Sequence, residues 1–221
     1  GVESGEKAIA IINGMKRYIP YLISLSANSP YFEGEKTGLA STRTKIFEGL
    51  PNTGIPENLR NYSEFQKFMR TLIGANSIES IREIWWDIRP HPGYGTVEIR
   101  IFDSIPNLSD IKDLAGLCQA LVVGMSNHYD NGTHLPYLDN WILYENKWRA
   151  TRYGVDADLI INEDGEQIPI IDEIVRTINN LSPEIEELNL SSNMDRLLNR
   201  LKNRHGYYKD QMKIYDENKD I

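Results

Sequence analysis

Two neighbouring strands are predicted in the middle of the chain by an alternation of apolar and polar residues. In residues 85–89, the apolar Trp86 and Ile88 alternate with charged residues. In residues 96–103 the alternating apolar and polar positions are Val97, Ile99 and Ile101 against Thr96, Glu98 and Arg100. Because successive side chains of a strand point to opposite faces, each strand has one apolar and one charged face. The Pro- and Gly-rich connection between the strands is typical of a turn.

The charged faces of these strands carry the first candidate chemistry. Residues two apart on a strand lie about 6.6 Å apart on one face, which places Glu98 beside Arg100. If the strands pair antiparallel with their charged faces together, Asp87 and Arg89 join them in one patch. Such a patch could hold a divalent cation and a phosphate. It could equally be a set of ion pairs on a solvated face, which antiparallel sheets often have.

Helices are predicted before and after these strands by apolar residues with a helical period. Ser4 is a suitable cap for the first helix, in which Pro20 should cause a kink or an early end. Residues 28–61 hold many turn-forming and few periodic residues, which predicts a long loop. Residues 63–73 are predicted as a helix that opens with a capping box. A helix from Ser109 is expected to pack on the apolar face of the second strand.

The rest of the chain is predicted to be helical apart from one hairpin. The predicted elements are a helix at 139–153, strands at 157–161 and 167–170, and helices at 171–180, 182–203 and 209–221. An Asp-Gly pair forms the hairpin turn, and Ser182 with Pro183 suits a helix start. No internal repeat or clear linker interrupts the pattern. The sequence therefore predicts one α+β domain over residues 1–221.

Composition and charge fit a globular protein and exclude some partners. Hydrophobic residues make up 40% of the 221 residues and charged residues 25%, which are ordinary values. The formal net charge of −8 argues against nonspecific binding to nucleic acid or to an anionic membrane. No apolar run approaches the roughly 20 residues that span a bilayer. A single cysteine, Cys118, excludes an internal disulfide, and we expect a cytoplasmic protein.

Common catalytic signatures are missing from the sequence. It contains no phosphate-binding loop, dinucleotide fingerprint or nucleophile elbow. The histidines have no zinc-like spacing, and they are His91, His128, His134 and His205. The charged strands therefore remain the leading candidate site.

Three blocks of sequence, in order, resemble one family of ligases. The run from Trp86 to Asp103 is similar to the Glu-x-Arg strand of the glutamine synthetase superfamily, with Glu98 and Arg100 at the motif positions. It resembles most closely the type 2 glutamate–cysteine ligases, also called carboxylate–amine ligases. The other two blocks are residues 25–43 and 146–157.

This resemblance implies an ATP-dependent ligase with ATP and Mg²⁺ as cofactors. Such an enzyme activates the glutamate side-chain carboxylate as an acyl phosphate and joins it to the amine of cysteine or another amine. By this likeness Glu98 is a magnesium ligand, and Arg100 stabilises the phosphate in transfer through its planar guanidinium. Arg43 is a candidate clamp for a substrate carboxylate or a phosphate.

Three other arginines are candidates for contact with the nucleotide. Arg149 and Arg152 are three residues apart and share one face near the end of a predicted helix. They could instead compensate the helix dipole as solvated side chains. Arg89, on the charged strand, is the third candidate.

The resemblance also implies a fold and a missing part. We expect a glutamine synthetase-like antiparallel sheet with helices on one face. In the family, further metal carboxylates and a His-x-His strand precede a Gly-Val pair that Gly1 and Val2 resemble. The chain is therefore expected to be the C-terminal part of the domain, inactive by itself, acting in a homo-oligomer or with an N-terminal half. The alternative is a non-catalytic module that binds a ligand or pairs with another subunit.

Overall fold

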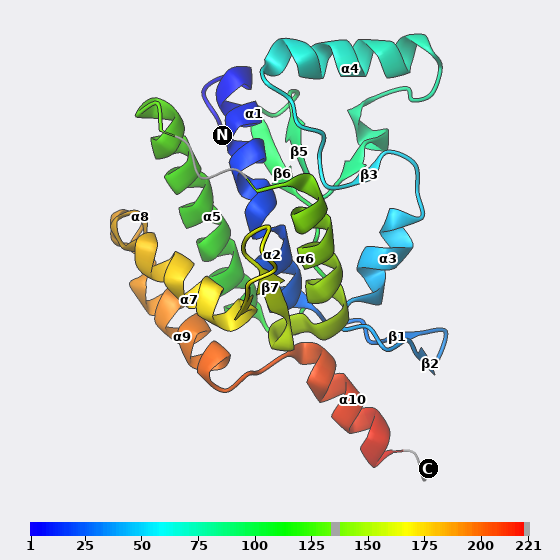
Figure 1. Cartoon of the computed structure of the whole chain (residues 1–221), viewed down its shortest axis with the longest axis vertical. Coiled ribbons are helices and arrows are strands. Elements are labelled where there is room, and N and C mark those ends of the chain that lie inside the picture. Colours follow the sequence, from blue (N-terminus) through cyan, green and yellow to red (C-terminus); the bar gives the residue numbers. More distant parts are fainter. Residues whose placement is uncertain (134–137, 219–221) are drawn as a thin grey trace.

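Two consecutive helices run through the middle of the molecule, with other long helices beside them (Figure 1). They are α1 (Gly5–Met15) and α2 (Ile19–Ser26). The helix α5 (Leu108–Asp130) packs on α1, and α6 (Asn140–Tyr153) packs on α2. This arrangement buries both central helices, which explains why α2 is apolar on every side.

The computed structural model describes residues 1–133 and 138–218. His134 and the predicted helix end at 219–221 lie outside the described residues. The remaining helical elements are η1 (Lys16–Tyr18), α3 (Thr42–Glu48), α4 (Tyr62–Gly74), η2 (Ile81–Glu83), η3 (Gly154–Asp156), α7 (Ile170–Asn180), α8 (Ser182–Glu187), α9 (Ser191–Lys202) and α10 (Tyr207–Glu217).

The start and the break of the central helix pair follow local sequence signals. The Ser4 side chain accepts a hydrogen bond from the Lys7 backbone N–H at 3.2 Å, which confirms the predicted cap. The chain then tightens into the 3-10 helix η1, and Pro20 lies in the first turn of α2. Proline is tolerated there because the first helical N–H groups have no partner within the helix.

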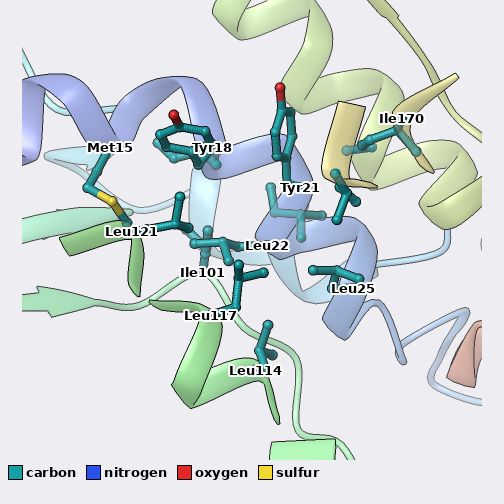
Figure 2. Close-up of a cluster of buried hydrophobic side chains, with 14 of the residues drawn as sticks. Met15, Tyr18, Tyr21, Leu22, Leu25, Ile101, Leu114, Leu117, Leu121 and Ile170 are labelled. Carbon is teal, nitrogen blue, oxygen red and sulfur yellow. The ribbon is translucent and has the colours of Figure 1, made fainter. Parts of the chain in front are cut away.

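The main hydrophobic core joins the central helices to α5 and to the C-terminal helices. Figure 2 shows Leu22 of α2 between Leu117 and Leu121 of α5 and the side chain of Ile101. These four side chains are at most 4% exposed. A second, smaller cluster forms under α4 around Phe65 and other residues.

The strands form four separate two-stranded sheets among the described residues. The pairs are β1 (Tyr31–Phe32) with β2 (Glu35–Lys36), β3 (Thr53–Gly54) with β4 (Trp85–Trp86), β5 (Ile88–His91) with β6 (Thr96–Ile99), and β7 (Asp158–Ile160) with β8 (Gln167–Pro169). Only β3–β4 is parallel. Helices and small sheets together agree with the α+β class, whereas a glutamine synthetase-like sheet stays a prediction.

Three details differ from the expectations drawn from sequence. The predicted loop at 28–61 contains the helix α3, together with short strands. The cap of α4 is Asn61 rather than Ser63, since the Asn61 side chain accepts from Glu64 N–H at 2.9 Å. The apolar side of the β5–β6 hairpin packs mainly on α1, while α5 packs on α1 and α9. Only Ile101, just beyond β6, reaches the α5 side chains (Figure 2).

Candidate functional site

The β5–β6 hairpin brings the predicted charged residues together. Its register places Arg89 directly opposite Glu98. Arg89 Nε donates to Glu98 Oε2 at 2.8 Å, and Arg100 Nη1 donates to Glu98 Oε1 at 2.7 Å. Glu98 therefore lies between two guanidinium groups, as expected for residues that share one strand face.

Arg89 is the interior member of this group. Its side chain is 5% exposed, and Nη1 donates to the backbone oxygens of Ile81 and Ile84 at 2.7 and 2.6 Å. These bonds tie the hairpin to the 3-10 helix η2. Arg89 thus fixes the orientation of Glu98, and its predicted contact with a nucleotide stays a prediction.

Two guanidinium groups determine the charge state of Glu98. Partial burial by itself would raise the pKa of Glu98, but the hydrogen bonds and charges of Arg89 and Arg100 outweigh it and lower that pKa. The carboxylate is therefore ionised at neutral pH and holds Arg100 in place.

Arg43 on α3 joins Arg100 at the end of the hairpin. Arg43 Nη2 donates to the backbone oxygen of Arg100 at 3.1 Å. Each of the two guanidinium groups lies over an aromatic ring, Arg43 over Phe47 at 4.3 Å and Arg100 over Trp85 at 5.0 Å. Burial is the main cause that lowers the pKa of Arg43. A partly buried guanidinium next to a second one is a favourable place for an anion.

Asp103 holds the start of α3 against the hairpin. Its carboxylate accepts hydrogen bonds from Ser29 Oγ at 2.7 Å and Ser41 Oγ at 2.8 Å. Ser29 Oγ in turn accepts from the Arg43 backbone N–H at 3.0 Å. Asp103 was part of the family-like block, but the sequence gave no reason to assign it this positioning contact.

A buried ion-pair cluster that sequence reasoning missed lies beside the two arginines. Lys147 Nζ contacts Asp87 Oδ2 at 2.7 Å and Glu48 Oε1 at 2.9 Å, and the Lys147 side chain is 2% exposed. Burial alone would lower the pKa of Lys147, but the charges of Asp87 and Glu48 outweigh it and raise that pKa. The cluster joins α6 to α3 and to the segment between β4 and β5.

A small cavity opens between these groups. Its lining includes Arg43, Arg100, Trp85 and Asp87, and it encloses about 20 Å³. Such a volume holds a water molecule or one oxygen of an anion, not a nucleotide. The cavity marks a point at which Arg43 and Arg100 could both face one anionic group.

Arg149 and Arg152 lie in another part of the molecule. Arg149 lines a cavity of about 380 Å³ and donates to Asp158 O at 3.1 Å and to Gln167 Oε1 at 2.6 Å. Arg152 is exposed and lies 5.9 Å from the Trp148 ring centre. The structure therefore unites Arg43, Arg89, Glu98 and Arg100 but not the α6 pair, listed here as Arg149 and Arg152.

The described residues by themselves do not fit a magnesium centre. Both oxygens of Glu98 already accept hydrogen bonds from guanidinium groups. Within residues 1–133 and 138–218, no group of three His, Cys, Asp or Glu side chains is arranged to hold a metal ion. Glu98 could supply one ligand at most, so a metal would need further ligands from elsewhere.

Comparison with known proteins identifies the class and then the family. A family model described as glutamate-cysteine ligase family 2 matches residues 1–215. One relative is provisionally named glutamate–cysteine ligase 2-1, from Frankia casuarinae, and is 43% identical over 211 residues, or 96% of this chain and 55% of the relative. Another, from Thermobifida fusca, is provisionally named glutamate–cysteine ligase 2 and is 44% identical over 195 residues, or 88% and 49%.

These matches define the chain as one of the ligases. It belongs to glutamate–cysteine ligase family 2, which confirms the resemblance seen in the three sequence blocks. The chain spans about half the length of the curated relatives it matches. In the part of the chain that the structure describes, no helix has the length and apolar character needed to cross a membrane.

Proposed function

We propose that this chain supplies the phosphoryl-stabilising part of an ATP-dependent ligase that joins the glutamate side-chain carboxylate to the amine of cysteine or another amine. One observation carries the proposal: Arg43 and Arg100 meet beside a small cavity, and Glu98 holds Arg100 from below at 2.7 Å. The family names of the relatives support the ligase class.

Arg100 and Arg43 have different tasks in this proposal. Arg100 donates to developing charge on the transferring phosphoryl group, because a guanidinium forms short, charge-assisted bonds to phosphate oxygens. Arg43 clamps the same group or the substrate carboxylate. Glu98 and Arg89 act as positioning residues that keep Arg100 at a fixed angle. Such preorganised charge costs no rearrangement during the reaction.

Bound ATP supplies the phosphoryl group that converts the carboxylate into an acyl phosphate, from which the amine then displaces phosphate. In this proposal Mg²⁺ accompanies the nucleotide, Glu98 supplies one ligand, and other parts of a longer protein supply the rest. Arg149 and Arg152 are proposed to contact the nucleotide away from the reacting group, since they line or border a separate, larger cavity. We place the enzyme in the cytoplasm, which suits its lone cysteine.

A second candidate function is a non-catalytic module that binds a ligand or pairs with another subunit, including another copy of this chain. It is favoured by the single carboxylate at the proposed metal position among the described residues. The two functions differ in one measurable property, which is amine-dependent release of phosphate.

The test uses a chimera in which the amino-terminal portion of the Frankia casuarinae relative precedes residues 1–215. With ATP, Mg²⁺, glutamate and cysteine, we expect turnover that falls about 10²-fold to 10³-fold in kcat for Arg100→Lys, the size of effect seen when one oxyanion donor is removed. Glu98→Gln should lower turnover and weaken the response to Mg²⁺.

Arg70→Lys, on the exposed side of α4, is the matched control and should keep the parent rate. Thermal melts of each variant separate lost chemistry from lost folding. Parent-like rates for both Arg100→Lys and Glu98→Gln would reduce the cluster to a solvated set of ion pairs and refute the proposal.

A further inference from the structure

A second, larger cavity lies between α1, the start of α6, the end of α5 and the segment before α4. It encloses about 560 Å³, within the range of small-molecule sites. Much of its wall is apolar and comes from Ala10, Leu59, Met125 and Leu143. It shares no lining residue with the cavity of Arg43 and Arg100.

The polar part of this wall centres on Lys16, which is 2% exposed. Lys16 Nζ donates to Glu57 O at 2.7 Å and to Asn58 Oδ1 at 2.8 Å. Both acceptors are neutral, and in residues 1–133 and 138–218 Lys16 forms no ion pair with a carboxylate. An ammonium has three N–H donors, so one remains for another acceptor. A buried charge without a counter-charge is costly, and a bound anion would offset that cost.

The charges around the cavity have one sign. Its described lining contains Lys16, Arg17, Arg60 and His128 and no Asp or Glu, although the whole chain carries a net charge of −8. Burial lowers the pKa of Lys16 to about 8, so the side chain is still largely an ammonium at neutral pH. The surroundings therefore combine a positive charge with an apolar wall.

We propose that this cavity binds a small organic anion with an apolar tail, with its carboxylate on Lys16 Nζ and its tail against Leu59, Met125 and Leu143. A bare inorganic anion would leave the apolar wall uncovered, and an uncharged apolar molecule would leave the ammonium without a counter-charge. The expected ligand class is thus a medium-chain or aromatic carboxylate. The site is independent of the proposed ligase reaction.

The test is isothermal titration calorimetry of the 221-residue chain with three compounds at pH 7. Octanoate should bind, while acetate, which lacks the tail, and octanol, which lacks the charge, should bind at least tenfold more weakly. Lys16→Gln keeps N–H donors for Glu57 O but removes the charge, and it should weaken octanoate binding at least tenfold. Ala10→Leu fills the cavity without touching Lys16 and should have the same effect.

Lys36→Gln is the matched control, because Lys36 is an exposed lysine on β2, and it should bind octanoate as the parent does. Thermal melts show which variants are folded, and Ala10→Leu decides the matter if Lys16→Gln does not fold. The proposal is overturned if octanoate does not bind, if octanol binds equally well, or if a folded Lys16→Gln or Ala10→Leu variant keeps the parent affinity.

Discussion

Lys147 is a buried ammonium whose two carboxylate partners come from distant parts of the chain. It contacts Asp87 and Glu48, and Asp87 is 60 residues away in sequence. Burial is the main cause that raises the pKa of Asp87, even beside Lys147. The cluster therefore stabilises the site only while all its charges are paired.

Removal of this ammonium is predicted to destabilise the chain strongly. Lys147→Met leaves Asp87 buried without its counter-charge, and loss of one partner of a buried pair costs roughly 3–5 kcal/mol. Urea denaturation of parent and variant measures this free energy of unfolding. The double variant Lys147→Met with Asp87→Leu should recover much of the loss, because an apolar pair needs no counter-charge. A single variant within about 0.5 kcal/mol of the parent, the usual range for surface changes, would contradict this account.

Lys16 predicts an alkaline gain in stability. Burial, the largest cause, lowers its pKa from 10.5 to about 8, so between these values the unfolded chain binds more protons than the folded one. The free energy of unfolding must then rise with pH across that window, and the lysine contributes about 3 kcal/mol at about 1.36 kcal/mol for each pKa unit.

The measurement is urea denaturation of parent and Lys16→Gln from pH 7 to pH 11, in buffer without organic anions. The difference between the two curves isolates Lys16 from tyrosines that titrate in the same range. A difference that does not change with pH would show that Lys16 has an ordinary pKa in the folded state.

At the residue scale, the sequence reveals neighbours along a strand and hides partners far apart. Glu98 and Arg100 are two residues apart, and a hairpin register adds Arg89, so their meeting was predictable. Lys147 and Asp87 meet only after α6 docks, and no local period encodes that. Arg149 and Arg152 were correctly placed on one helix, but the helix directs them to a different cavity.

At the scale of elements, the end of α6 depends on Gly154. This residue has φ of 56°, and a Cβ there would lie 2.5 Å from Tyr208 Cε1 and 3.2 Å from Ala40 Cβ. Tyr208 is held in turn by a hydrogen bond from its hydroxyl to Tyr153 O at 2.9 Å. The turn after α6 therefore accommodates the α10 ring only because the residue has no side chain.

Gly154→Ala is predicted to cost more than backbone strain alone. Gly34→Ala is the matched control, because Gly34 has φ of 84° with no atom within 4 Å of the added Cβ. Both variants pay roughly 1–2 kcal/mol for a left-handed residue, and only Gly154→Ala also pays for the contact with Tyr208. Thermal melts should therefore show the larger fall in Tm for Gly154→Ala. Equal falls would mean that Tyr208 moves aside freely.

Element boundaries follow the sequence where the signal is local. The caps, the proline and the Asp-Gly turn act within one turn of chain, and they place α1, α2 and the β7–β8 hairpin correctly. At α4, Asn61 and Ser63 are both good caps, and a tertiary bond from the Tyr62 N–H to Glu6 Oε2 at 3.0 Å accompanies the choice of Asn61. The short helix α3 was missed because seven residues give too little periodicity to detect.

At the scale of the whole molecule, the described residues hold only part of what the proposed reaction needs. They contain an anion-binding pair of arginines and a positioned carboxylate, and the chain spans about half the length of the relatives. The single-domain prediction for residues 1–221 and the inactivity of the chain by itself both stay predictions, and the second can be tested directly.

We predict that the 221-residue chain by itself shows no ligase turnover. Its one carboxylate at the proposed metal position is already bonded by Arg89 and Arg100, and no described group of acidic or histidine side chains completes a metal site. The measurement is phosphate release with ATP, Mg²⁺, glutamate and cysteine, beside the active chimera as a positive control. A cooperative thermal melt must accompany the result, so that inactivity is not confused with unfolding. Robust phosphate release that depends on cysteine would mean that these residues complete an active site by themselves, perhaps the strongest reason to look for ligands supplied between two copies of the chain.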